Sequence, residues 1–214
     1  MKVNVHNLKG EVVSQMDIRD DIYGVPFNEA VVHQALVRQL ANRRQGTVDT
    51  KTRGEVDRSN KKLFSQKHTG RARRGSAKSP LLRGGGVAFG PHPRSYRQAM
   101  PRKMQRLATK CVLSAKVSSG KLTVIDKFDF DRPKTKEMLD ILVALGIGSS
   151  VIIATVGNED NVVKSARNLS GVKTMPACQL NVADLLSYKV LIMSKDAIRA
   201  VEDVVVAGAG GKGN

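Results

Sequence analysis

Side chains that could grip phosphate and stack on bases are concentrated between residues 58 and 110. Arginine carries a planar guanidinium group that can hold two phosphate oxygens at once, and the arginines there include Arg71, Arg73, Arg74 and Arg94. Phe89, His92 and Tyr96 offer flat rings on which unpaired bases can stack. The chemistry that this combination supports is the binding of a nucleic acid, with single-stranded regions as the targets of the rings.

The charge of the chain is confined to the same region. Residues 58–125 contain no aspartate or glutamate, and residues 58–110 hold 15 lysines and arginines. Residues 42–110 carry a net charge of +16, against −1 for residues 1–41 and +2 for residues 111–214, within a total of +17. A focused excess of this kind is the electrostatic footprint of a polyanion. A solvated linker is the simpler alternative, but well-patterned sequence flanks the segment on both sides, which disfavours it.

We therefore predict a nucleic-acid interface over this segment and the start of the helix that follows it. The segment is poor in large apolar residues, so we expect it to be mobile until a polyanion orders it. The predicted contact residues are Arg58, Lys61, Lys62, Gln66, Lys67, His68, Thr69, Gly70, Arg71, Arg73, Arg74, Lys78, Arg83, Gly85, Phe89, Arg94, Tyr96, Arg97, Arg102, Lys103 and Arg106.

Motifs for other chemistries are incomplete. Gly84–Gly86 is not followed by Gly-Lys-Ser/Thr, so it does not make a phosphate-binding P-loop. Cys111 and Cys178 form no CxxC pair, which argues against zinc and against a disulfide framework, and we expect each thiol to be buried. All four histidines lie in the first half of the chain, which disfavours a hydrolase triad. We predict no cofactor, no metal and no catalytic residue.

The rest of the sequence predicts an α/β fold. Residues 2–18 alternate like a hairpin, and residues 25–46 and 99–120 have helical periodicity. Strands are predicted at 121–126, 150–156, 172–177 and 189–193, alternating with helices at 135–146, 158–171, 181–188 and 194–206. Continuous apolar runs such as 151–154 suit parallel strands that are covered on both faces. We expect a doubly wound, mainly parallel sheet flanked by helices, with one long extended basic loop inserted.

This pattern divides the chain into parts. We predict a single globular α/β domain from residues 1–46 and 99–214, an extended basic loop at 47–98, and a flexible C-terminal tail at 207–214. A hairpin of roughly 26 residues per limb can reach at most about 85 Å. No window of the sequence is long and apolar enough to predict a membrane span or a secretory signal, so we expect an intracellular protein.

Five motifs resemble a known family. The bacterial form of large-ribosomal-subunit protein four is similar in QKHTGRARRGSAKSP at 66–80, RGGGVAFGPHPRSY at 83–96, KMQRLA at 103–108, DRPKTKEM at 131–138 and SARNL at 165–169. The resemblance implies a structural protein, not an enzyme, which is a primary binder of the large ribosomal RNA. It also implies contacts with several RNA domains, a role in early subunit assembly, and residence on the cytoplasmic ribosome of a bacterium.

In the resembled family the loop helps to form the constriction of the polypeptide exit tunnel. The tip residues would be Lys67, His68, Thr69, Gly70 and Arg71, and the implied partners are neighbouring ribosomal proteins, including the other tunnel-constriction protein, and the nascent peptide. Gly85, Phe89, Gly90, Pro93, Arg94 and Tyr96 match the returning limb. Phe64-Ser65 stands where the family has tryptophan-arginine, and His68 stands where it has glycine. The resemblance therefore does not define the conformation of the tip in this chain.

Two other functions remain as alternatives. A nucleotide-binding α/β enzyme would need polar groups beyond the strand ends, for which only Thr155, Asn158 and Asp160 are available. A general DNA-binding or chromatin protein would bind duplex DNA and structured RNA with similar affinity.

Overall fold

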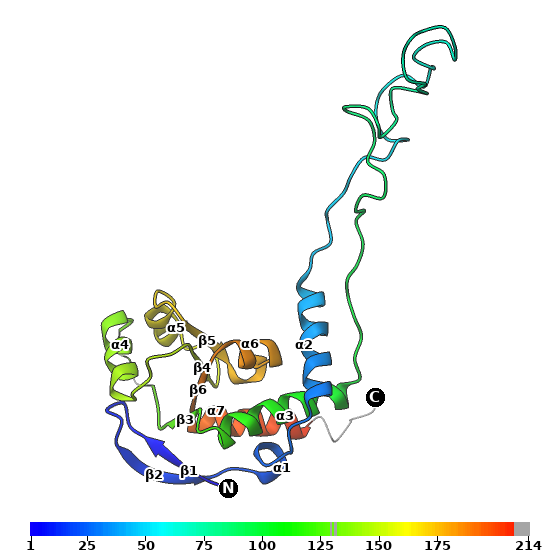
Figure 1. The fold of residues 1–214 in the computed structure, drawn as a ribbon. Coiled ribbons are helices and arrows are strands. Elements are labelled where there is room, and N and C mark those ends of the chain that lie inside the picture. Colours follow the sequence, from blue (N-terminus) through cyan, green and yellow to red (C-terminus); the bar gives the residue numbers. More distant parts are fainter. Residues whose placement is uncertain (129, 131, 208–214) are drawn as a thin grey trace. The chain divides into compact units, whose positions relative to one another are not determined.

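The chain divides into two units. A computed structural model describes residues 1–128, 130 and 132–207, so most of the predicted tail at 207–214 lies outside the described residues. One unit, which we call the body, comprises Met1–Leu40 and Ala99–Asn214, and the other, the arm, comprises Ala41–Gln98 (Figure 1).

The body is built from alternating strands and helices. Along the chain the elements are β1 (Lys2–His6), β2 (Val12–Asp17), α1 (Asp20–Tyr23), α2 (Glu29–Arg43), α3 (Arg102–Ser118), β3 (Leu122–Ile125), α4 (Thr135–Ala144), β4 (Val151–Thr155), α5 (Asp160–Ala166), β5 (Val172–Pro176), the 3-10 turn η1 (Ala177–Gln179), α6 (Val182–Ser187), β6 (Val190–Ser194) and α7 (Lys195–Ala207). The last residues of α2 belong to the arm.

The strands form one mixed sheet in the order β2-β1-β3-β6-β4-β5. Every neighbouring pair is parallel except β1 and β2, which form the antiparallel hairpin predicted at residues 2–18. The Asn7 side chain closes the hairpin turn by accepting hydrogen bonds from the amides of Lys9 and Glu11, each at 2.9 Å. The predicted fold class, a mainly parallel α/β sheet with flanking helices, is confirmed.

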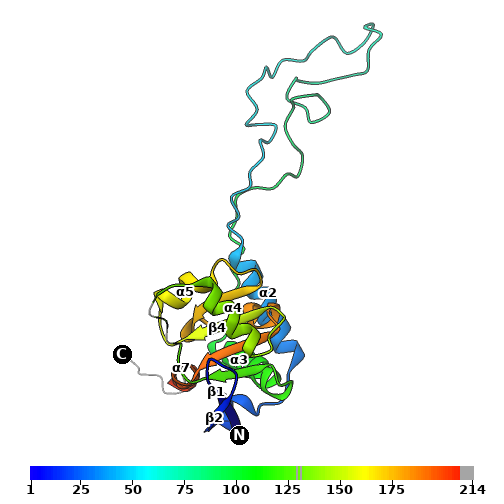
Figure 2. The same cartoon turned by 90° about the vertical axis from the view of Figure 1, so that its left-hand side faces the viewer.

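Helices cover both faces of the sheet, which explains why the central strands are apolar throughout (Figure 2). In β6, Leu191 and Met193 join a core cluster with residues of α1, α2, α3, α6 and α7, whereas Ile192 between them joins a cluster with residues of α4 and α5. Successive side chains of a strand point to opposite faces, so both faces need apolar residues. Every described residue of β4 is buried for the same reason.

Local signals set the helix ends, two short elements were missed, and one prediction needs correction. Asn28 accepts a hydrogen bond from the Val31 amide at 3.2 Å and so caps α2. The one-turn helices α1 and η1 were not predicted, because segments this short carry no periodicity. Cys111 is buried as predicted, but the prediction for Cys178 is wrong, because η1 exposes its side chain.

Tyr23 of α1 has a buried hydroxyl with no hydrogen-bond partner among the described residues. The side chain is 1% exposed, and burial, with a smaller effect of the Glu202 carboxylate, raises the pKa of Tyr23 above its ordinary value near 10. The folded state therefore keeps a proton that the unfolded chain loses. Stability from this group is complete below pH 10 and is lost as the pH rises above it.

We expect Tyr23→Phe to leave the free energy of unfolding at pH 7 unchanged or to raise it by up to about 1 kcal/mol, because an unpaired buried hydroxyl is removed. The decline of stability above pH 10 should become shallower than in the unsubstituted protein. Urea unfolding at pH 7 and at pH 10.5 measures both effects. A loss of more than about 1 kcal/mol at pH 7 would mean that the hydroxyl makes a stabilising bond.

Candidate nucleic-acid interface

The arm consists of two antiparallel limbs joined by backbone hydrogen bonds (Figure 1). The Arg94 amide donates to the Gly46 carbonyl at 3.1 Å, and the Val87 amide donates to the Lys51 carbonyl at 2.9 Å. Nearer the tip, the Leu63 amide donates to Gly75 at 3.1 Å. The pairing is sparse, with long unpaired stretches between the bonds, which is why no strand longer than a single bridge forms there.

A series of turns thickens the returning limb between residues 76 and 86. The amides of Ser79, Leu82 and Gly85 each donate to the carbonyl three residues earlier, at 3.3, 3.0 and 2.8 Å. The Arg58 guanidinium reaches across from the other limb to the Arg83 carbonyl at 2.9 Å. A Cβ on Gly86 would overlap the backbone of Arg53, so glycine is required where the two limbs touch.

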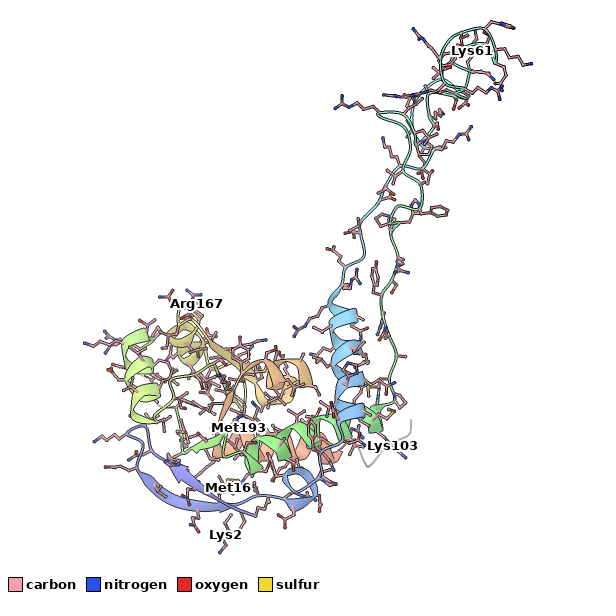
Figure 3. All side chains as sticks on the ribbon, viewed as in Figure 1. Lys2, Met16, Lys61, Lys103, Arg167 and Met193 are labelled. Atoms are coloured by element: carbon pink, nitrogen blue, oxygen red, sulfur yellow. The ribbon has the colours of Figure 1, made fainter. Side chains whose placement is uncertain are left out.

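The basic side chains of the arm point outward. Figure 3 shows Lys61 projecting from the far end of the arm. Most of the predicted contact residues in the arm are exposed: Arg58, Lys61, Lys62, Gln66, Lys67, His68, Gly70, Arg71, Arg73, Arg74, Arg83, Phe89, Arg94 and Arg97. Thr69, Lys78, Gly85 and Tyr96 are partly buried. The structure therefore spreads the predicted residues along both limbs instead of gathering them in one cleft.

Beyond Arg43, the described lysines and arginines of the arm have no carboxylate partner among the described residues. Asp49 instead pairs with His92 at 3.0 Å, and Glu55 accepts hydrogen bonds from the amide and hydroxyl of Thr52 at 2.7 Å each. These bonds, the one from the amide above all, lower the pKa of Glu55. The positive charges are thus left for an external anion.

At the tip, His68 adopts a conformation that suits glycine. Its φ is +63°, and Gly70 two residues later has a φ of +62°. The Ser65 hydroxyl donates to the Lys67 carbonyl at 3.2 Å, and the Lys62 ammonium donates to Gln66. The backbone at position 68, where the family has glycine, is thus left-handed in this chain. This conformation is sterically unfavourable for histidine.

We expect His68→Gly to keep the tip pairing and to protect the Leu63 amide from hydrogen exchange at least as well as the unsubstituted protein. His68→Val should lower that protection about tenfold, because a β-branched residue at positive φ costs roughly 1–2 kcal/mol. Amide exchange followed by NMR measures both. Equal protection of the Leu63 amide in all three proteins would show that the left-handed backbone at position 68 does not affect the stability of the tip pairing.

A stacked cluster at the base of the arm includes one residue that the sequence prediction missed. The guanidinium carbons of Arg44 and Arg94 lie 3.9 and 4.6 Å from the centre of the Tyr96 ring. A hydrogen bond from Arg94 lowers the pKa of the Tyr96 hydroxyl. Arg44 was not among the predicted contact residues, but the pair Arg43-Arg44, directly before Gln45-Gly46 at the end of the predicted helix, was a signal that could have added it to the site.

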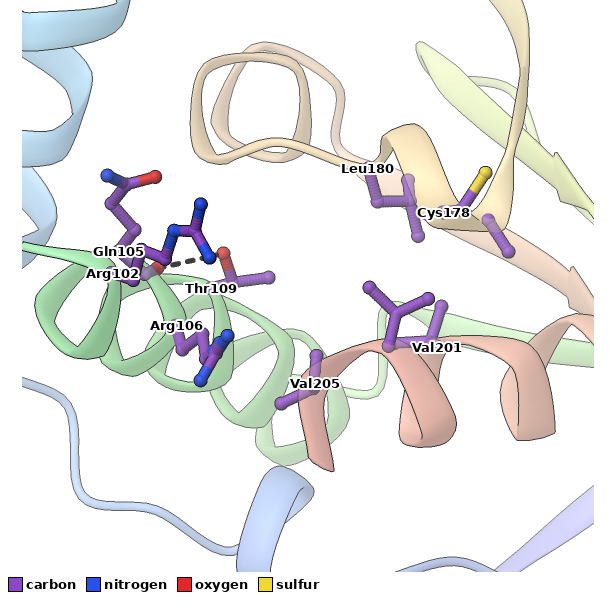
Figure 4. Close-up of a pocket in the computed structure, with 10 residues that line it drawn as sticks. Arg102, Gln105, Arg106, Thr109, Cys178, Leu180, Val201 and Val205 are labelled. Atoms are coloured by element: carbon purple, nitrogen blue, oxygen red, sulfur yellow. Dashed lines mark hydrogen bonds between the residues drawn. The ribbon is translucent and has the colours of Figure 1, made fainter. Parts of the chain in front are cut away.

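The three predicted residues outside the arm lie in the first turns of α3. Arg102 and Lys103 are exposed and Arg106 is partly buried. Arg102 and Arg106 line a pocket of about 370 Å³, whose opposite wall is formed by apolar residues of α7 and by η1 (Figure 4). Of the three, only Lys103 lies outside that lining.

Two of the three groups that an enzyme would need, Thr155 and Asp160, are already engaged. The Thr155 hydroxyl is buried and donates to the Gly157 carbonyl at 2.7 Å, and Asp160 pairs with Lys164 at 3.2 Å. Within the described ranges no group of three or more histidine, cysteine or acidic side chains is placed to hold a metal ion. Also within them, no helix is long and apolar enough to cross a membrane.

An α/β body with a long loop of cations that have no carboxylate partner is typical of one class of protein, the proteins that bind nucleic acids. Comparison with protein families identifies the family within this class. Residues 16–204 match the model of the ribosomal protein L4/L1 family, and the chain belongs to this family. It is therefore a ribosomal protein, a component of the ribonucleoprotein that carries out translation.

Individual relatives match over nearly the full chain. The large ribosomal subunit protein uL4 of Dehalococcoides mccartyi is 52% identical over 204 residues, which is 95% of this chain and 97% of the relative. The proteins of the same name from Desulforudis audaxviator and Pelotomaculum thermopropionicum are each 49% identical, over 94% of this chain and 97% and 98% of their own lengths. The resemblance inferred from the five motifs is confirmed.

Proposed function

We propose that the chain is a structural constituent of the large ribosomal subunit and binds its ribosomal RNA through the arm. The observation that supports this function best is the set of exposed arm cations without carboxylate partners, in a member of a ribosomal protein family. An arm of this composition has too few apolar contacts to serve as a packing element of the body, and no described residue of either core cluster belongs to it.

Binding proceeds by neutralisation of phosphates and release of their counterions. Lysines and arginines on both limbs meet the RNA backbone, which fixes position more than sequence. Glycines such as Gly70, where an added Cβ would meet open space, leave room for RNA to approach the backbone closely. Phe89, which is fully exposed, is available to stack on an unpaired base. The sparse hydrogen bonds between the limbs order the arm only in part, and bound RNA orders the rest of it.

The finer parts of the proposal come from the family. The protein contacts several domains of the ribosomal RNA and supports early assembly of the subunit in the cytoplasm. Its tip, Lys67–Arg71, lines the polypeptide exit tunnel beside a neighbouring ribosomal protein and meets the nascent peptide. The exposed side chains of Lys67, His68 and Arg71 are compatible with contact to RNA and peptide on the same loop.

The salt dependence of binding tests the mechanism. If eight phosphates are neutralised, the logarithm of the affinity for large-subunit ribosomal RNA should fall against the logarithm of salt concentration with a slope of about −6 to −7. Filter binding between 50 and 300 mM KCl measures the slope, with duplex DNA of equal length as the control ligand. A slope near −2, or equal affinity for the DNA, would contradict specific ribosomal RNA binding.

Crosslinking tests the tunnel assignment. A photoreactive amino acid at position 67 or 71 should crosslink to ribosomal RNA and, in translating ribosomes, to the nascent chain. The same probe at the exposed Val143 of the body serves as the control. Crosslinks to RNA from position 143 alone would refute the assignment of the arm to the tunnel.

A further inference from the structure

The base of the arm contains an open groove that the general charge of the arm does not explain. It has a volume of about 770 Å³ and is lined by two short segments, 42–46 and 93–97, excluding position 43. This volume lies within the range of roughly 300–1,000 Å³ that is usual for small-ligand sites. The lining includes three arginines, Arg44, Arg94 and Arg97, and no carboxylate.

Hydrogen bonds within the arm hold this groove in shape. The Asn42 side chain accepts from the Gln98 amide at 2.7 Å and donates to the Gln98 carbonyl at 3.4 Å. The Gly46 carbonyl accepts from the Arg94 amide at 3.1 Å. Gly46 has a φ of +73°, and a Cβ there would overlap the Arg94 carbonyl oxygen, so this junction requires glycine. The base of the arm is therefore preorganised.

Within the groove the Tyr96 ring fixes the arginines. Arg44 and Arg94 stack within 3.9 and 4.6 Å of the ring centre, yet both remain exposed. A stacked guanidinium leaves its outer plane free for a base and N–H groups on its edge for phosphate, and Arg94 uses only part of that edge for its bond to the Tyr96 hydroxyl. Because the planes are held in advance, less side-chain entropy is lost when a ligand binds.

Guanidinium edges beside a stacked ring favour a ligand that is both anionic and planar. A phosphate alone would use the guanidinium edges but not the stack, and an acidic peptide would leave the stack uncovered as well. A base within a duplex has both faces covered by its neighbours, so it cannot enter the stack. An unpaired nucleotide supplies the phosphate and a free ring face together.

We propose that the Arg44–Tyr96–Arg94 cluster is a subsite for one unpaired nucleotide of RNA, an inference that rests on the proposed binding of RNA by the arm. The base extends the stack on a guanidinium plane, and its phosphate is held by Arg94 and Arg97. The base of the arm is thus a selective contact, whereas the limbs beyond it bind mainly phosphate.

The test compares two ligands of equal charge on the full chain. A fluorescein-labelled uridine trinucleotide and an abasic trimer with the same phosphates are titrated at 50 mM KCl, and binding is followed by anisotropy. The unsubstituted protein should prefer the base-bearing trimer about 5- to 150-fold, the range expected for one stacked base. Absence of a preference would overturn the inference.

Variants locate the stacked base. Tyr96→Leu should abolish the preference, and Arg44→Lys, which keeps the charge and leaves the ring in place, should reduce it about two- to fivefold. Tyr96→Phe should retain it, as should the controls Arg167→Lys and Phe27→Leu at exposed residues of the body. If Tyr96→Leu and Arg44→Lys keep the full preference, or if the preference depends on Phe89, the other exposed ring of the arm, the cluster is not the subsite.

Two parallel measurements separate this inference from the proposed function. Triglutamate that competes as strongly as the base-bearing trimer would mean an acidic-peptide site and would overturn the inference. Large-subunit ribosomal RNA is titrated with the same variants. If arm-dependent binding of that RNA persists while no trimer preference exists, the subsite fails and the proposed function stands. If the RNA binds equally well without the arm, the proposed function itself fails.

Discussion

Replacing residues 48–92 by a four-residue Gly/Ser linker should lower the affinity for large-subunit ribosomal RNA about 10³-fold at 150 mM salt. The replacement removes 11 lysines and arginines. If six of them neutralise phosphates, loss of the associated counterion release accounts for a factor of that size, and the salt slope should fall from about −6 or −7 to about −2. Filter binding over a salt series measures the affinity and the slope in one experiment.

The shortened protein should still fold. Neither core cluster of the body contains a described residue of the arm, so no buried apolar surface is lost. Gly46 and Arg94 are already joined by a backbone hydrogen bond, so a short linker can close the chain between positions 47 and 93 without strain. We expect the thermal unfolding midpoint to change by no more than a few degrees, which circular dichroism can verify.

A Gly/Ser loop of the original length separates charge from length. This variant should bind as weakly as the short one, because only cations release counterions from the RNA. If it binds as well as the unsubstituted protein, the length of the arm matters and its charge does not. Unchanged affinity in both variants would refute RNA binding by the arm.

The body could be predicted from the sequence because its signals are local and repeated. The run 151–154 and the alternation around residues 2–18 each reflect which faces are buried, and the sheet order agrees with both. The elements missed, α1 and η1, span four and three residues, too few to show a helical period. The exposure of Cys178 depends on η1, so it could not be predicted without that turn.

The arm was predictable in charge but not in geometry. Its shortage of carboxylates, which are absent from position 58 onward, is visible in the sequence, and the unpaired cations follow directly from that composition. The contact between Arg53 and Gly86 and the stack of Arg44 on Tyr96 join residues more than 30 positions apart without any periodic pattern. The positive φ of His68 likewise depends on the closed tip, because histidine by itself disfavours that conformation.

The central strand of the body should be the most sensitive to loss of volume. Ile192 of β6 lies opposite Thr123 of β3 and Ile153 of β4 and is fully buried among residues of α4 and α5. Because strands flank β6 on both sides and helices cover both faces, the surroundings have little freedom to collapse into a cavity. Substitutions that remove methyl groups from Ile192 should therefore lower the free energy of unfolding by an amount near the upper end of the range usual for buried residues.

We expect Ile192→Ala to lower the free energy of unfolding by about 3–5 kcal/mol and Ile192→Val to lower it by about 1 kcal/mol. Val143→Ala in α4, where the side chain is 69% exposed, should change it by less than about 0.5 kcal/mol. Urea unfolding followed by circular dichroism gives all three values. Since RNA contact is assigned to the arm, the folded Ile192→Val protein should bind ribosomal RNA with unchanged affinity and salt slope. A cost below about 1 kcal/mol for Ile192→Ala would mean that β6 is not the packed centre of the two cores.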